Sequence, residues 1–198
     1  MSVSKIKATV FSQEQLASDV FSMWLEVGSI ASEAKPGQFI SVYSNDDSKL
    51  LPRPISICEI DRENGRLRIV YRVVGYGTKE FSGCKAGDTL DIMGPLGNGY
   101  TLKKDKAILV AGGIGVPPML ELAKELDCEK TIVLGYRDEL FLNKEFEQYG
   151  KVVIATEDGS CGTKGNVLDA IRAESVDGQV IYSCGPTPML RALKQYAA

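Results

Sequence analysis

An arginine between two prolines is the first residue in this chain whose setting indicates chemistry. Arg53 lies in the apolar stretch "LLPRPISICEI" (50–60), and Ser56 follows it. A guanidinium forms strong, charge-assisted hydrogen bonds with phosphate oxygens, and a serine hydroxyl is a further donor. The pattern therefore predicts a phosphate-binding segment. The alternative is an ion pair between Arg53 and a nearby carboxylate, Glu59 or Asp61.

The stretch "VVGYGTKEF" (73–81) is predicted to complete the same site. Gly75 and Gly77 allow the backbone to come close to a bound group. Thr78 is suited to cap a short helix, and a helix N-terminus attracts anions. Together with Arg53, this turn predicts a site for a diphosphate.

A second glycine-rich turn, "VAGGIGVPPML" (110–120), follows a buried strand and opens a helix. Gly112, Gly113 and Gly115 permit a tight turn, and Pro117 suits the first helical turn. Free amides and the helix dipole at this point suit a pyrophosphate or a nicotinamide ribose. The alternative is a strand-to-helix turn that binds nothing.

The stretch "SCGPTPML" (183–190) repeats this arrangement after the last predicted strand. Cys184 and Gly185 end the strand, and Pro186 begins the approach to a helix. Ligands of open α/β sheets bind at the carboxyl ends of the strands, so both turns are expected to face one crevice. A buried thiol without a role is the alternative for Cys184.

Acidic residues follow the two middle strands of the same predicted sheet. Glu157 and Asp158 could contact a ribose or form a solvated turn. Asp138 or Glu139 would repel the 2′-phosphate of NADP, whereas Arg137 could attract it. NAD is therefore expected in preference to NADP.

Histidine is absent from the sequence, which excludes Ser-His-Asp triads, Cys-His pairs and histidine metal sites. Hydride transfer between two cofactors needs no histidine, because the cofactors carry the reactive atoms. The cysteines are far apart in sequence, so we expect isolated thiols in a reducing compartment rather than a disulfide or a metal site. They are Cys58, Cys84, Cys128, Cys161 and Cys184.

The first hundred residues are predicted to form a small antiparallel β-barrel. Runs of β-forming residues are separated by turn signals, among them Asn64-Gly65, a strong hairpin marker. The predicted strands are 5–11, 20–27, 38–44, 53–60, 66–74 and 88–94, and one short helix is expected from Thr78 to about Gly83.

From residue 106 the pattern changes to alternating strands and helices, which is typical of a parallel sheet with helices on both faces. The polar stretch "TLKKD" (101–105) is predicted to be a linker. We therefore expect a barrel domain over 1–100 and an α/β nucleotide-binding domain over 106–198. The strands of the second domain are predicted at 107–112, 131–136, 151–156 and 179–185, and its helices at 117–126, 143–149, 166–174 and 187–196.

The composition argues against nucleic-acid binding and membrane association. The net charge is −3 and the pI is about 5.2, so no basic field favours polyanions. The longest apolar run, 107–120, is interrupted by glycines and prolines, and the N-terminus lacks the apolar stretch of a signal peptide. We expect a cytoplasmic protein.

These motifs together resemble the ferredoxin–NADP reductase superfamily, in its order and over essentially the whole chain. "RPIS" and "GYGT" resemble its flavin segments, "GPLGNGY" resembles the closing turn of its barrel, and "AGGIGVPPM" and "CGPTPML" resemble its nicotinamide-nucleotide signatures. Within the superfamily, "PGQF", "LLPRPISI", "YRVVGYGT" and "DIMGPLGNGY" most resemble the electron-transfer subunits of heteromeric NAD-dependent dihydroorotate dehydrogenase.

The resemblance implies an FAD-dependent NAD(P)H oxidoreductase subunit of pyrimidine biosynthesis, which passes electrons between the FMN of a catalytic partner subunit and NAD(H). No side chain is expected to be catalytic, because hydride passes between cofactors. The implied FAD contacts are Arg53, Pro54, Ile55, Ser56, Val70, Tyr71, Arg72, Gly75, Gly77 and Thr78. The implied NAD contacts are Gly112, Gly113, Gly115, Pro117, Cys184, Gly185 and Pro186.

The family that the chain resembles carries a C-terminal [2Fe-2S] cluster on four cysteines, of which the first three are closely spaced. This sequence ends at "QYAA" without such a group, so no metal ligands are expected in it. A cluster is expected only if a C-terminal segment is missing here, and a relative that works without a cluster is the alternative.

Two other functions stay open at this point. One is a freestanding NAD(P)H–flavin reductase, or the reductase subunit of another redox complex. The other is a non-catalytic regulatory module that binds nucleotides.

Overall fold

The structure, a computed structural model, describes residues 3–46 and 51–197. The chain divides into two compact units, Met1–Tyr100 and Thr101–Ala198, which we call the barrel unit and the α/β unit. Leu50, the first residue of the predicted phosphate-binding stretch, lies outside the described residues. The predicted fold class, an antiparallel barrel followed by a parallel-sheet domain, is confirmed.

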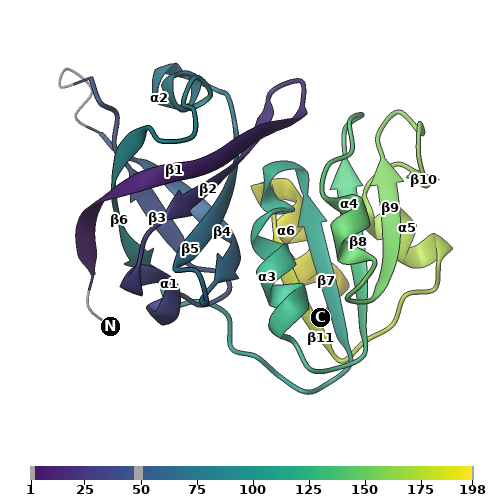
Figure 1. Ribbon diagram of the computed structural model, residues 1–198. Helices are drawn as coiled ribbons and strands as arrows, with labels where there is room; N and C mark the ends of the chain where they lie inside the picture. The colour runs from purple at the N-terminus through teal and green to yellow at the C-terminus, as the bar shows by residue number, and fades with distance from the viewer. Residues whose placement is uncertain (1–2, 47–50, 198) are drawn as a thin grey trace. The chain divides into compact units, whose positions relative to one another are not determined.

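In the described part of the barrel unit, six strands close into an antiparallel barrel in the order β1-β2-β5-β4-β3-β6 (Figure 1). The first strand is longer than predicted, because it continues past the barrel's edge into a hairpin and pairs with both β2 and β6. The bounds are β1 (Ser4–Ala17), β2 (Val20–Glu26), β3 (Phe39–Val42), β4 (Arg53–Asp61), β5 (Arg66–Arg72) and β6 (Thr89–Leu96).

Alternating residues of the strands fill the barrel. Leu67, Ile69 and Tyr71 of β5 belong to one apolar core with residues of every other strand of the barrel. Helix α1 (Ser29–Glu33), which was not predicted, packs Ile30 and Ala31 into this core. A helix of one turn leaves no apolar period in the sequence, which is why the pattern did not reveal it.

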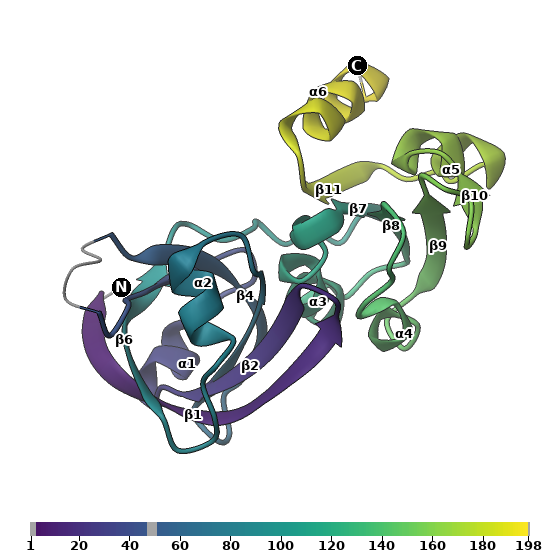
Figure 2. The ribbon, with the colours of Figure 1, turned by 90° about the horizontal axis from the view of Figure 1, so that it is seen from above.

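Helix α2 (Tyr76–Phe81) covers one end of the barrel (Figure 2). It begins two residues earlier than predicted. Phe81 is fully buried in the barrel core and makes an edge-to-face contact with the Tyr71 ring, with centroids 6.2 Å apart. This contact fixes the helix over the end of β5.

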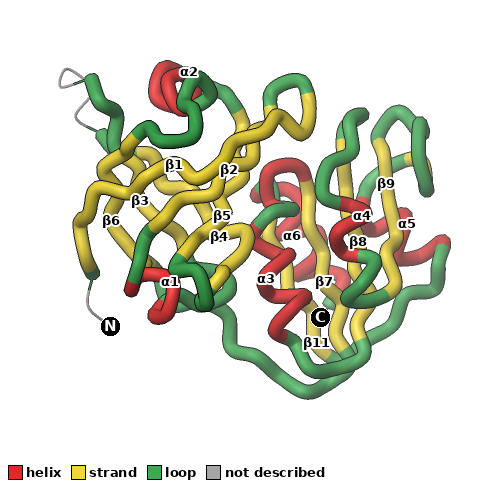
Figure 3. Tube along the Cα trace, in the orientation of Figure 1, coloured by secondary structure: helices red, strands yellow, loops and turns green. Residues whose placement is uncertain are grey.

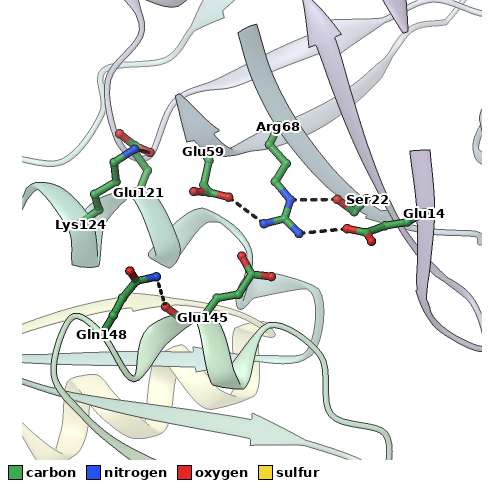
Figure 4. A network of polar contacts seen from close by, with 8 residues as sticks. All are labelled: Glu14, Ser22, Glu59, Arg68, Glu121, Lys124, Glu145 and Gln148. Atoms are coloured by element: carbon green, nitrogen blue, oxygen red, sulfur yellow. Dashed lines mark hydrogen bonds and ion pairs between the residues drawn. The ribbon is translucent and has the colours of Figure 1, made fainter. Parts of the chain in front are cut away.

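Arg68 lies on the outer face of β5 and is nevertheless buried (Figure 4). Its guanidinium contacts Glu59 Oε2 at 2.7 Å, Ser22 Oγ at 2.9 Å and Glu14 Oε1 at 3.5 Å. These partners come from β4, β2 and β1, so one side chain links four neighbouring strands. The alternation of side chains along a strand places Arg68 away from the core, but alternation alone does not reveal that this side chain is buried.

The described residues of the α/β unit form a five-stranded parallel sheet in the order β10-β9-β8-β7-β11. The strands are β7 (Ala107–Gly112), β8 (Lys130–Tyr136), β9 (Lys151–Thr156), β10 (Thr163–Lys164) and β11 (Val180–Cys184). The two-residue edge strand β10 was not predicted. It pairs with the end of β9 after a glycine-rich turn.

Helices cover both faces of this sheet, as predicted (Figures 1 and 3). Helices α3 (Pro118–Glu125) and α4 (Asn143–Phe146) lie on one face, and α5 (Val167–Ala173) and α6 (Thr187–Tyr196) lie on the other. On α3, Lys124 Nζ lies 3.5 Å from the carboxylate of the buried Glu121 (Figure 4). At the end of α4, the Gln148 side chain donates a hydrogen bond to the Glu145 carbonyl oxygen (Figure 4). No helix among the described residues is long and apolar enough to cross a membrane.

We predict that Arg68→Met destabilises the barrel unit by about 3 kcal/mol, because it leaves Ser22 and Glu59 without their buried partner. The control Arg66→Met removes a more exposed pair with Glu26 on the same strand and should cost less than about 1 kcal/mol. Trp24, the single tryptophan, lies on β2 and reports unfolding of the barrel by fluorescence in urea. Equal losses for the two variants would contradict the assignment.

Candidate cofactor sites

Arg53 and the glycine turn before α2 lie together at one end of the barrel. Arg53 pairs with Val42 at the start of β4, and its side chain lies against Gly77. A Cβ on Gly77 would be 3.1 Å from Arg53 Nε, so the glycine lets the arginine side chain lie close to the turn without shifting. The two predicted parts of a diphosphate site are therefore neighbours.

The carboxylates considered as partners for Arg53 are engaged elsewhere. Glu59 pairs with Arg68, and Asp61 accepts hydrogen bonds from Asn64, which hold the pKa of Asp61 below its ordinary value. Within the described residues Arg53 donates only to carbonyl oxygens, at 2.9 Å to Leu51 and 3.5 Å to Pro52. The ion-pair alternative is therefore wrong for these residues, and part of the guanidinium stays available to an anion.

The neighbouring predicted FAD residues lie on two faces of the barrel wall. Ile55 and Tyr71 are buried in the core, and the Tyr71 hydroxyl donates to Gln13 Oε1 at 2.8 Å. Burial raises the pKa of Tyr71 far above its usual value. Their side chains are thus occupied, and contacts with a ligand would come from their backbone.

The other face carries Ser56, which is partly open to a ligand, and Val70, which is buried at 3% exposed. Ser56 and Val70 flank the paired residues Ile57 and Ile69, so both point outward, and no described residue bonds the Ser56 hydroxyl. Pro54 is exposed. Arg72 lies farther along β5, where its Nε is 3.3 Å from Asp19 Oδ2.

Thr78 caps α2 from inside the helix. Gly75 is the N-cap residue, and the Thr78 hydroxyl accepts from the amides of Val74 at 3.0 Å and Gly75 at 3.2 Å. The prediction that Thr78 begins the helix is corrected, because its side chain reaches back over the first turn. Its hydroxyl is committed to the turn that places Gly77 on Arg53.

A hollow of about 620 Å³ lies beside this turn, lined by Val73, Gly75, Tyr76, Lys79 and Glu80. Tyr76 is 56% exposed, and Glu80 accepts a hydrogen bond from the Asn45 amide at 2.7 Å and another from Ser44 Oγ. These lining side chains were not predicted. The exposure of Tyr76 could have been predicted from the sequence, since this tyrosine lies between two glycines, which have no side chains to pack against it.

In the α/β unit, the two predicted nucleotide turns lie side by side. Strands β7 and β11 are adjacent and parallel, with Ala111 opposite Cys184. A Cβ on Gly115 would be 2.3 Å from the Cys184 carbonyl oxygen, and one on Gly185 would be 3.2 Å from the Gly112 amide nitrogen. Glycine is therefore required at position 115 by contact between two stretches of backbone.

The start of α3 offers fewer free amides than the sequence suggested. Pro117 and Pro118 have no N–H, while the amides of Val116 and Met119 bond the carbonyls of Gly113 and Val116. The idea of an anion held by this first helical turn is corrected accordingly. Donors for a nucleotide would come from the preceding turn, Gly113–Gly115.

The remaining candidates lie at or near the carboxyl edge of the sheet. Burial raises the pKa of the Cys184 thiol, so it stays protonated at neutral pH. Asp158 accepts two hydrogen bonds from Ser160, which lower its pKa, and Asp138 accepts from the Glu139 amide at 2.7 Å. Asp158 thus lies in a hydrogen-bonded turn. All five cysteines are free, and no group of metal-ligand side chains occurs among the described residues.

Comparison with known proteins accounts for this geometry. The oxidoreductase FAD-binding domain family matches residues 7–100. The electron transfer subunit of dihydroorotate dehydrogenase B (NAD(+)) from Fusobacterium nucleatum is 42% identical over 93% of this chain and 77% of its own length. The subunit of the same name from Bacillus caldolyticus is 41% identical over 98% of this chain and 79% of its own. The chain belongs to this family of electron transfer subunits. The predicted resemblance is confirmed.

The fold of the family recurs in solved structures. An NADH-dependent reduced ferredoxin–NADP oxidoreductase studied for electron bifurcation superposes with a TM-score of 0.88 at 32% identity, covering 96% of this chain and 71% of that chain. A ferredoxin reductase of carbazole 1,9a-dioxygenase has a TM-score of 0.83 at 21% identity, covering all of this chain and 66% of its own, which supports the fold alone.

For this member of the electron transfer subunit family, we predict that Gly115→Ala destabilises the α/β unit by about 3 kcal/mol, because the added methyl overlaps the Cys184 carbonyl. The control Gly113→Ala meets no atom within 4 Å and should cost about 1 kcal/mol for its positive φ. The exchange rates of the backbone amide hydrogens in β7 and β11 measure the destabilisation in both variants. An unchanged exchange rate in Gly115→Ala would show that the turns are not in contact.

Proposed function

We propose that this chain is the electron transfer subunit of a dihydroorotate dehydrogenase B. In this proposal the barrel unit holds FAD, the α/β unit holds NAD(H), and electrons pass between NAD and the FMN of a catalytic partner subunit. The observation that carries the proposal is the contact of Arg53 with Gly77, in a chain about 42% identical to subunits of this name.

The residues at the end of the barrel fit the diphosphate of FAD. Arg53 keeps donors available, Ser56 Oγ is open, and no atom lies within 4 Å of the position of a Cβ on Gly75. Exposed apolar groups beside them, Val74 at 80% and Tyr76 at 56%, suit an aromatic ligand better than water. FAD combines these two requirements, because it carries a diphosphate between two ring systems.

Bound FAD supplies the redox chemistry, by exchanging hydride with the nicotinamide ring and passing electrons onward. The chain's residues bind and orient the cofactors. Arg53 neutralises phosphate charge, and the backbone of β4 and β5 sets the position of the ring. The proposal needs no proton donor from a side chain, which agrees with the absence of histidine.

The α/β unit supports the nicotinamide part of the proposal. The turns at Gly112–Gly115 and Cys184–Pro186 lie next to each other at the carboxyl ends of β7 and β11, the position where open α/β sheets bind ligands. The protonated Cys184 thiol is a neutral group at this edge. NAD is favoured by Asp138 and Glu139, whose charges oppose a 2′-phosphate.

We also infer a cytoplasmic location for this activity. Five free thiols are stable in a reducing compartment. The net charge of −3 offers no attraction to anionic lipid or nucleic acid.

Arg53→Met should weaken FAD binding about 10- to 100-fold, because charge-assisted hydrogen bonds to the diphosphate are lost. Arg66→Met, at the far end of β5, removes the same charge and should bind FAD as the parent does. Titration of the apoprotein, followed by quenching of flavin fluorescence, gives both affinities. FAD binding unchanged in Arg53→Met would overturn the assignment of this site.

Co-expression with an FMN-containing dihydroorotate dehydrogenase subunit of the same organism should yield one complex on size-exclusion chromatography. With the C-terminal cluster segment of the family present, that complex should reduce NAD⁺ with dihydroorotate, because electrons need both proteins. Without that segment the chain should bind FAD and NAD(H) but not relay electrons to the partner. Separate elution of the two proteins, with NADH still reducing an artificial acceptor through FAD, would favour a freestanding reductase. Absence of any NADH-dependent reduction would favour a regulatory module.

A further inference from the structure

The connection between the two units is anchored on the barrel side up to its last residue. Tyr100 donates its amide hydrogen to the Pro36 carbonyl at 2.9 Å. Its ring lies against Gly37, where a Cβ would be 2.5 Å from Tyr100 Cδ2. Gly37 has φ +86°, which also favours glycine. The "PGQF" and "GPLGNGY" stretches are thus held together, and Tyr100 is held with them.

On the α/β side the anchor begins with the next residue. The Tyr182 hydroxyl donates to the Thr101 carbonyl at 2.9 Å and accepts from the Lys103 amide at 2.9 Å. Tyr182 belongs to β11 and is 7% exposed, so its ring is fixed in the sheet's packing. The polar side chains of 101–105 are exposed, as expected of a linker, but their backbone is not free.

A third anchor holds the end of this stretch. The Lys106 amide donates to Gln179 Oε1 at 3.2 Å, and Lys106 Nζ lies 3.0 Å from carboxylate oxygens of both Asp177 and Glu129. The stretch 101–106 is therefore fastened to the α/β unit at its start, middle and end. The stretch that was expected to be a linker is therefore hydrogen-bonded to the α/β unit through its backbone.

We propose that Tyr182 is a positioning residue for electron transfer, because it removes the slack from the connection between the units. The anchors meet at the Tyr100–Thr101 peptide, so no residue of the connection is left without an anchor on one unit or the other. A free stretch of five residues would have an end-to-end distance that fluctuates around ~12 Å. Hydride transfer needs reacting atoms about 3–3.5 Å apart, so such slack would lower the fraction of productive encounters. The electron-transfer part of this inference rests on the proposed function.

Tyr182→Phe tests the anchor, since it keeps the buried ring and removes both hydrogen bonds. Trypsin should cleave after Lys103 and Lys104 about tenfold faster in this variant, the factor expected for the loss of two ordinary hydrogen bonds. Tyr196→Phe on the exposed part of α6 is the matched control and should be cut at the parent rate. Cleavage sites are identified by mass spectrometry. Equal cleavage in Tyr182→Phe and the parent would overturn the proposal, whatever the flavin content.

Stopped-flow reduction of bound FAD by NADH tests the positioning role. The rate constant should fall at least about threefold in Tyr182→Phe, with FAD content and NADH affinity unchanged. Inserting Gly-Ser-Gly-Ser between Tyr100 and Thr101 restores slack without touching Tyr182 and should lower the rate as well. Faster trypsin cleavage with unchanged reduction rates in both variants would refute positioning. A parent that binds no FAD would refute the proposed function, while the trypsin experiment would still decide on the anchor.

Discussion

Close approach at glycine is the physical constraint on which both candidate sites depend. Arg53 lies against the turn before α2 at Gly77, where a Cβ would be 3.1 Å from Arg53 Nε. In the α/β unit, the turns after β7 and β11 touch only because Gly115 leaves room for the Cys184 carbonyl. Gly37 does the same for the Tyr100 ring. Each contact brings together segments far apart in sequence, so each glycine acts through the fold rather than through local flexibility.

A bulge in β4 determines which residues of this strand face the barrel core and which face away from it. Between Ile57 and Glu59 the strand advances two residues while its partner β5 advances one, from Ile69 to Arg68. The extra residue lets Ile57 and Ile60 face the same core although their spacing is odd. Without it, Glu59 would point into the core beside Leu67, and the ion pair with Arg68 would be lost. The bulge thus keeps the isoleucines of β4 in the core and the Glu59–Arg68 ion pair outside it.

Much of the fold was predictable, because period-two alternation and strand–helix alternation are local signals. The six barrel strands and four of the five sheet strands follow from them, and α6 was predicted to the residue. The remainder depended on contacts between distant segments. Neither the burial of Arg68 nor the anchoring of 101–105 by Tyr182 leaves a trace in composition. Polar residues predicted a linker correctly for the side chains and wrongly for the backbone.

The same distinction applies to the chemistry of the sites. Residue types indicate what the sites are expected to bind, whereas the electrostatic state of a side chain follows from its burial. Burial raises the pKa of both Tyr71 and Cys184, so each stays neutral through the physiological range. With no histidine in the sequence, neither site contains the side chain whose charge most often changes near neutral pH. In the proposed sites, proton exchange would therefore be left to the cofactors and their substrates.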